Sequence, residues 1–122
     1  MFELTIMGET YQFKFGMKFV RDINKRVTRK VEGLDTVEEL GLSMAIAKVI
    51  DKDLDTLYDV LRLANEGYKP RLELKTFDEW IEDEKTDIDA VFNEVIDFFG
   101  KSNCTKIAYN KVKAEVDKLE QA

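Results

Sequence analysis

Three aspartates at alternate positions, Asp51, Asp53 and Asp55, have the spacing of the first three calcium ligands of an EF-hand loop. The later positions of the motif are not met. The sixth position of such a loop needs a glycine and here is Thr56, and the twelfth needs a bidentate glutamate and here is Arg62. We therefore interpret the aspartates as the acidic start of a helix, where the helix dipole favours carboxylates.

A second group of carboxylates could bind a divalent cation or form an acid–base pair; it comprises Glu82, Asp83, Glu84, Asp87 and Asp89. A hydrolytic pair needs one carboxyl in an apolar or paired setting, so that the two pKa values separate. These residues surround a predicted junction between helices at the surface. They fit a solvated acidic face better, and a hydrolase or metal enzyme would require a buried acid pair elsewhere.

The 122-residue chain has no histidine and a single cysteine, Cys104. Without histidine, the commonest general base is missing and every Ser-His or Cys-His nucleophile pair is excluded. Cys104 lacks a second thiol for an intrachain disulfide, which favours a reducing, intracellular compartment. No phosphate-binding glycine loop, zinc-ligand spacing or nucleotide fingerprint is present. We expect a protein that is not an enzyme and that binds no cofactor and no metal.

Charge is distributed unevenly along the chain, whose formal net charge is −6. Residues 14–30 contain seven basic residues and one acid, whereas residues 73–97 contain ten acids and two bases. Two opposed patches on one chain favour a head-to-tail contact between copies. The residues that we expect to make this contact are Lys18, Arg21, Lys25 and Arg29 on the basic side, and Glu82, Asp83, Asp87 and Asp89 on the acidic side.

The basic segment, residues 17–31, also supports an alternative function. A helix with its bases on one face can bind DNA or RNA through phosphate contacts, with an affinity that falls as salt rises. The negative total charge and the lack of aromatic residues between the exposed bases argue against this. A small nucleic-acid-binding regulatory protein is therefore the alternative.

Polar and apolar residues alternate over residues 1–16, and this period of two predicts a β-hairpin. Gly8 and Glu9 fit a two-residue type II′ turn between its strands. After Gly16 the period becomes 3.6, which predicts a helical core over residues 17–100 and a loosely packed or frayed C-terminal helix over residues 101–122. The predicted fold is mainly α with an N-terminal β-hairpin (α+β): one domain, residues 1–122, in which five to six helices pack on the hairpin.

Sequence signals also predict the ends of these helices. Glycines at positions 33, 67 and 100 are expected to end helices. Capping patterns predict helix starts at Thr36 with Glu39, at Asp53, at Thr76 with Glu79, and at Thr86 with Asp89.

The predicted helix over residues 36–50 carries two apolar stripes on different sides of its helical wheel. One comprises Val37, Leu40, Met44 and Ala47, and the other Leu42, Ile46 and Val49. Either the helix is buried on both sides, or one stripe faces another subunit. Leu63, on the next helix, also faces outward on its wheel. We take Leu42, Ile46, Val49 and Leu63 as candidates for apolar contacts with a partner or a second copy.

Three segments carry a family resemblance: FELTIMGETYQFKFGMKFVRDINKRV, GLSMAIAKVIDKDLDTLYDVLRLAN and FDEWIEDEKTDIDAVFNEVIDFF. Together they resemble the tail assembly chaperones of long-tailed phages and of prophages in Gram-positive bacteria. The resemblance covers residues 1–100 and lies in the overall pattern, because no catalytic motif anchors it. It transfers no functional residue to this chain.

The resemblance implies a mostly helical, non-enzymatic protein in the cytoplasm of an infected or lysogenic bacterial host. Such proteins form ring-like or spiral homo-oligomers, coat the tape measure protein and recruit tail tube subunits, and they are absent from the mature virion. A longer form made by translational frameshifting carries an extra domain for the tube protein, and the present chain would be the short form. We expect no membrane segment, because no apolar run approaches the ~18 residues that span a bilayer.

Overall fold

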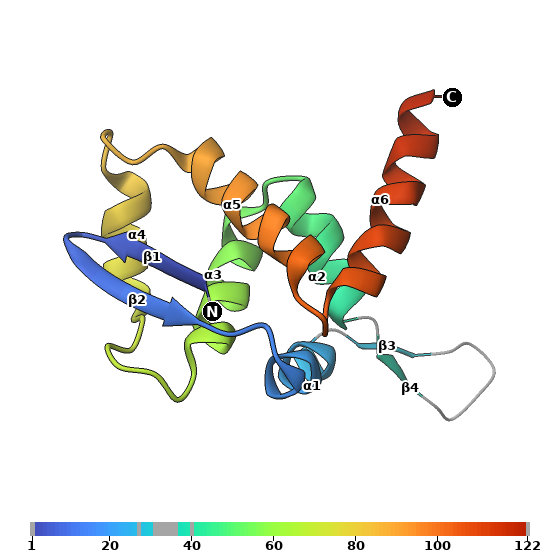
Figure 1. Ribbon diagram of the computed structural model, residues 1–122, viewed down its shortest axis with the longest axis horizontal. Helices are drawn as coiled ribbons and strands as arrows, with labels where there is room; N and C mark the ends of the chain where they lie inside the picture. Colours follow the sequence, from blue (N-terminus) through green and yellow to red (C-terminus); the bar gives the residue numbers. More distant parts are fainter. Residues whose placement is uncertain (1, 27, 31–36, 40, 122) are drawn as a thin grey trace.

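The computed structural model describes residues 2–26, 28–30, 37–39 and 41–121 (Figure 1). In chain order the elements are β1 (Phe2–Ile6), β2 (Glu9–Phe13), α1 (Met17–Arg26), β3 (Thr28–Lys30), β4 (Val37–Glu39), α2 (Gly41–Ile50), α3 (Leu54–Asn65), α4 (Leu74–Glu82), α5 (Ile88–Lys101) and α6 (Lys106–Gln121). The predicted fold class is confirmed, since an N-terminal antiparallel hairpin precedes a mainly helical chain.

The hairpin turn lies one residue earlier than the sequence pattern predicts. Ile6 pairs with Glu9, so the loop residues are Met7 and Gly8, with φ angles of 52° and 83°. Positive φ at both positions is typical of a type I′ turn, and the predicted type II′ turn at Gly8 and Glu9 is wrong. Both alignments place the same apolar side chains on one face, so the alternation could not choose between them.

Packing beyond the hairpin explains this register. The backbone N–H of Lys14 donates to the carbonyl of Ala64 on α3 at 2.8 Å, which takes the chain away from the sheet after Phe13. Phe15 then stacks on Phe99 of α5, with ring centroids 4.8 Å apart. The apolar face of the hairpin thus lies on the helices, as a two-stranded sheet needs in order to be stable in water.

The basic helix ends earlier, and the next helix begins later, than predicted. Arg29 pairs with Glu38 in the antiparallel β3–β4 ladder, so the predicted helices over residues 17–31 and 36–50 are wrong beyond Arg26 and before Gly41. The expected glycine stop at position 33 and the expected cap at Thr36 lie outside the described residues.

A contact between helices positions the start of α2. Asn24 Oδ1 on α1 accepts a hydrogen bond from the backbone N–H of Leu42 at 2.9 Å. A Cβ atom on Gly41 would lie 2.1 Å from the carbonyl oxygen of Ile23, so only glycine allows this approach. A side chain of another helix therefore accepts a hydrogen bond from a backbone N–H in the first turn of α2, where the sequence predicted a local capping box.

The ends of the later helices agree with the prediction in part. Asp53 is the N-cap of α3, as predicted, and its carboxylate accepts from the backbone N–H of Thr56 at 3.1 Å. Asp87, rather than Thr86, caps α5 by accepting from the N–H of Ala90 at 3.0 Å. For α4 the predicted Thr76 cap is wrong, because the helix begins at Leu74. The helix predicted to end at position 100 extends to Lys101.

The last helix, α6, extends away from the rest of the chain toward the C-terminus (Figure 1). Its apolar residues Ala108, Tyr109 and Val112 pack against the core, whereas Leu119 in its last turn is 77% exposed. Among the described residues, no helix is both long enough and apolar enough to cross a membrane.

Candidate interaction surfaces

The exposed side of α1 carries positive charge, as its helical wheel predicts. Lys18, Arg21 and Lys25 are all exposed, and Met17, which is 49% exposed, lies at the start of the same side. We call these four residues the basic face. The opposite side of α1 is buried through Phe19 and Ile23. Arg29, the fourth predicted basic residue, lies in β3, and its side chain is outside the described part of the chain.

Lys18 is neutralised within its own chain. Its Nζ lies 2.7 Å from Asp22 Oδ2 and 3.2 Å from Glu66 Oε1. Its hydrogen bond with Asp22 raises the pKa of the Lys18 amino group most, and its hydrogen bond with Glu66 raises it further. The bond between Lys18 and Asp22 also lowers the pKa of the Asp22 carboxyl. Arg21 and Lys25 form no ion pair within the part of the chain that the structure describes, so they carry the uncompensated charge of the basic face.

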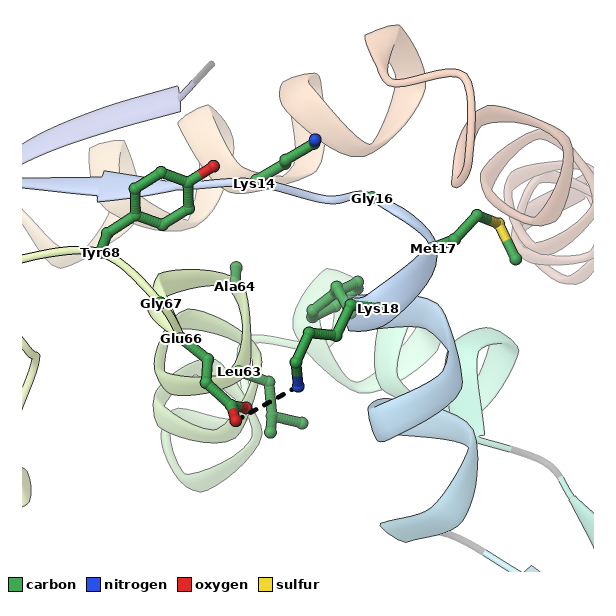
Figure 2. Close-up of a pocket in the computed structure, with 10 residues that line it drawn as sticks. Lys14, Gly16, Met17, Lys18, Leu63, Ala64, Glu66, Gly67 and Tyr68 are labelled. Carbon is green, nitrogen blue, oxygen red and sulfur yellow. Dashed lines mark ion pairs between the residues drawn. The ribbon is translucent and has the colours of Figure 1, made fainter.

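A hollow of about 360 Å³ lies beside this ion pair, between the start of α1 and the end of α3 (Figure 2). Lys14, Lys18, Glu66 and Tyr68 contribute its polar lining. Leu63, which the helical wheel placed outward, lies on the α3 side of the hollow and is only 8% exposed. The prediction of an outward Leu63 is therefore wrong, because α1 packs across this side of α3.

The other three apolar candidates are also buried. Leu42, Ile46 and Val49 are exposed by 9%, 0% and 0%, so their predicted outward position is wrong. The physical reason is that α2 packs against α1, α3, α5 and α6, which cover this stripe. Met44, on the other predicted stripe, is 39% exposed. The stripe expected to contact a partner is therefore part of the core of its own chain.

The four predicted acidic residues lie around the junction of α4 and α5. Glu82, Asp87 and Asp89 are exposed and Asp83 is half-buried. Asp83 Oδ1 accepts from the backbone N–H of Lys85 at 2.9 Å, and Asp89 Oδ1 lies 2.7 Å from Lys52 Nζ. Hydrogen bonds and an ion pair thus orient these carboxylates. Among the described residues, no three His, Cys, Asp or Glu side chains are grouped so that they could hold a metal ion.

Beside this junction the structure forms a groove that the sequence patterns did not reveal. Its volume is about 440 Å³, and it lies between β1, the end of α4 and the start of α5. We call it the acidic groove. Its floor is apolar, formed by Leu4, Trp80 and Val91. Its charged lining consists of one base, Lys85, and four carboxylates: Glu3, Asp83, Asp87 and Glu94.

Two carboxylates of this groove could be grouped from the sequence. Asp87 and Glu94 are seven residues apart, which places them on the same side of α5. Glu3 lies beside Asp87 and Glu94 only because the hairpin packs against the helices, which the sequence pattern does not show.

The fold and these surfaces define a small α+β protein with oppositely charged surfaces on different elements. A family model described as phage tail assembly chaperone protein, TAC, matches residues 3–113, and the chain belongs to this family. This confirms the family that the sequence resembles. No match was found among curated proteins or among solved structures. The matched range contains the basic face and the acidic groove. Proteins of this class are generally non-enzymatic and interact with phage tail proteins.

Proposed function

We propose that this chain coats a tape measure protein during tail assembly and recruits tail tube subunits around it, without catalysing a reaction. The observation that carries the proposal is the family match over residues 3–113, which includes nearly all of the described fold. Copies of the chain would associate with one another in a ring or spiral along the tape measure protein. We place this activity in the host cytoplasm, with the chaperone absent from the mature virion.

The physical requirement for such a chaperone is many weak contacts along a long partner. A tape measure protein is a long, largely helical chain whose apolar stretches would aggregate if left uncovered. Contacts repeated by neighbouring copies provide avidity while each remains weak enough to be displaced as the tube polymerises. A longer, frameshifted form would supply the domain that contacts the tube protein.

The apolar contacts with the tape measure protein must come from side chains that the fold leaves exposed. Ile107 and Leu119 on α6 are exposed by 65% and 77%, and Leu74 at the start of α4 by 53%. Leu42, Ile46, Val49 and Leu63 are occupied in the core. We therefore assign this role to Ile107 and Leu119 on α6.

Co-expression with the tape measure protein of the same phage or prophage tests this function. We expect the tape measure protein to move from the insoluble to the soluble fraction and to co-elute with the chaperone. A matched variant, Ile107→Asp with Leu119→Asp, changes two exposed positions and should fold while retaining less of the partner. An equally insoluble tape measure protein with and without the wild-type chain would contradict the proposal.

The nucleic-acid alternative rests on the exposed Arg21 and Lys25 of the basic face. Its charge is reduced because Lys18 is paired with Asp22 and Glu66. The aromatic residues nearest in sequence, Phe15 and Phe19, are each 2% exposed, so they offer no surface on which a base could stack. A gel shift at low salt distinguishes the two functions, since the absence of a shifted band would exclude the alternative.

A further inference from the structure

We propose that the acidic groove of one copy receives the basic face of the next copy, so that α1 is the donor and the groove the acceptor of a head-to-tail contact. This inference rests on the proposed function, in which copies associate along a tape measure protein. It adds which two surfaces meet.

The acidic groove combines an apolar floor with a charged rim. Leu4, Trp80 and Val91 on the floor are exposed by 7%, 7% and 8%, and the groove is open to solvent above them. Glu3, Glu94 and Lys85 are exposed on its rim, where four carboxylates outnumber the single amine. A surface of this kind favours an occupant that presents an apolar side chain surrounded by positive charge.

Two rim carboxylates are already held in position. Asp83 accepts a hydrogen bond from the N–H of Lys85, and Asp87 accepts one from the N–H of Ala90. Each of these bonds is to the backbone, so the carboxylates keep their orientation without a partner. Preorganised charges lose less entropy on binding than freely rotating ones.

The basic face has the complementary composition. Met17 is half-exposed and is followed on the same side by Arg21 and Lys25. Methionine is a flexible apolar side chain that adapts to irregular surfaces. Met17 can therefore enter toward the floor of the groove, while Arg21 and Lys25 reach its carboxylates.

The two surfaces also match in length. Met17, Arg21 and Lys25 recur at every fourth position, which makes a row about 12 Å long on α1. Asp87 and Glu94 mark about 10 Å along α5, from its N-cap to its second turn.

The two surfaces lie on different parts of the molecule. The hairpin and α4, which border the acidic groove, lie at the far left of Figure 1, and α1 lies at its lower centre. A contact between two different surfaces is heterologous, and repetition builds a ring or a helical assembly. This arrangement would place successive copies in a row.

Sedimentation velocity over a concentration series tests the contact. We expect wild-type protein to form species larger than a monomer, and these should weaken as salt rises. Arg21 and Lys25 are both exposed. The double variant Arg21→Glu with Lys25→Glu should weaken association about tenfold or more, because it places negative charge against the carboxylates of the groove. The matched control is Lys111→Glu with Lys113→Glu, at exposed positions of α6. This control has the same net charge as Arg21→Glu with Lys25→Glu and should associate like wild type.

A mixing experiment tests the head-to-tail arrangement itself. A second double variant, Glu3→Gln with Glu94→Gln, keeps the basic face and weakens the groove. At a concentration at which each double variant alone is monomeric, their mixture should form a one-to-one complex that grows no further. In that complex one intact basic face meets one intact groove, while the remaining two surfaces do not match.

Trp80, the only tryptophan of the chain, reports on the floor of the groove. Its emission should change over the concentration range in which wild-type protein associates, and it should stay constant for Arg21→Glu with Lys25→Glu. Three results would overturn the proposal: wild-type protein that stays monomeric, double variants that associate like wild type, or association without a change in Trp80 emission. Tape measure protein solubilised by the wild-type chain in any of these cases would leave the chaperone function standing.

Discussion

Asn65 Oδ1 accepts a hydrogen bond from the backbone N–H of Leu72 at 2.7 Å, which ties the end of α3 to the segment that leads into α4. The Asn65 side chain also donates from Nδ2 to the carbonyl oxygens of Gln12, at 3.0 Å, and Pro70, at 3.1 Å. Asn65 is fully buried. One amide thus joins β2, α3 and the loop before α4. The end of α3 and the start of this loop border the hollow beside Lys18.

Replacing Asn65 with alanine should destabilise the fold by about 2–4 kcal/mol, because buried backbone groups lose their partner. Urea denaturation followed by circular dichroism measures the change. Asn110→Ala, at an exposed position of α6, is the control and should stay within about 0.5 kcal/mol of wild type. If both variants unfold at the same urea concentration, the buried amide does not have this role.

Replacing Gly41 with alanine should destabilise the fold by about 3 kcal/mol. The new Cβ would clash with the backbone of α1, so the two helices would have to separate. At Gly16 a new Cβ would meet only the flexible Lys14 side chain, at 3.1 Å, so Gly16→Ala should cost less than about 1 kcal/mol. The comparison of the two midpoints in urea is the measurement. A Gly41→Ala protein as stable as Gly16→Ala would show that the helices do not approach this closely.

Replacing Met7 with asparagine should stabilise the protein by about 0.5–1 kcal/mol. Met7 has a φ of 52° in the hairpin turn, and Asn-Gly is the preferred sequence of a type I′ turn. Met7→Val should lower the melting temperature, because a β-branched residue is disfavoured at positive φ. Thermal melts that rank the valine variant above the asparagine variant would contradict the turn assignment.

The N-cap at Asp53 should contribute a pH-dependent part of the stability. Hydrogen bonding by Thr56 lowers the pKa of the Asp53 carboxyl below its ordinary value. A carboxyl whose pKa is lowered by folding stabilises the protein above its unfolded pKa, about 3.9, and loses this effect as pH falls through the lower folded value. Asp53→Ala should cost about 1 kcal/mol at pH 7.

The difference in stability between wild type and Asp53→Ala should shrink as the pH is lowered from 5 toward 2. Urea midpoints of both proteins, measured over this pH range, give the difference. Asp53→Asn keeps an acceptor for the Thr56 N–H and serves as the uncharged control. A difference between wild type and Asp53→Ala that is constant across that pH range would contradict the assignment of Asp53 as an ionised cap.

Elements whose signals are local could be predicted from the sequence alone. Alternation with aromatic residues predicted the hairpin and its buried face, because one face of a two-stranded sheet must be covered. The helical wheel of α1 placed Lys18, Arg21 and Lys25 on one exposed side, since four-residue spacing brings side chains together on any helix. The family also followed from sequence pattern.

Features that depend on distant residues follow from the packing of the elements against one another. Helix α2 begins at Gly41 because Asn24 on another helix caps it, and α1 ends at Arg26 before β3 pairs with β4. A wheel shows that Leu42, Ile46 and Val49 share a side, but not that α1, α3, α5 and α6 cover it. Glu3 and Glu94 are far apart in the sequence but line the same groove, because the hairpin packs on the helices.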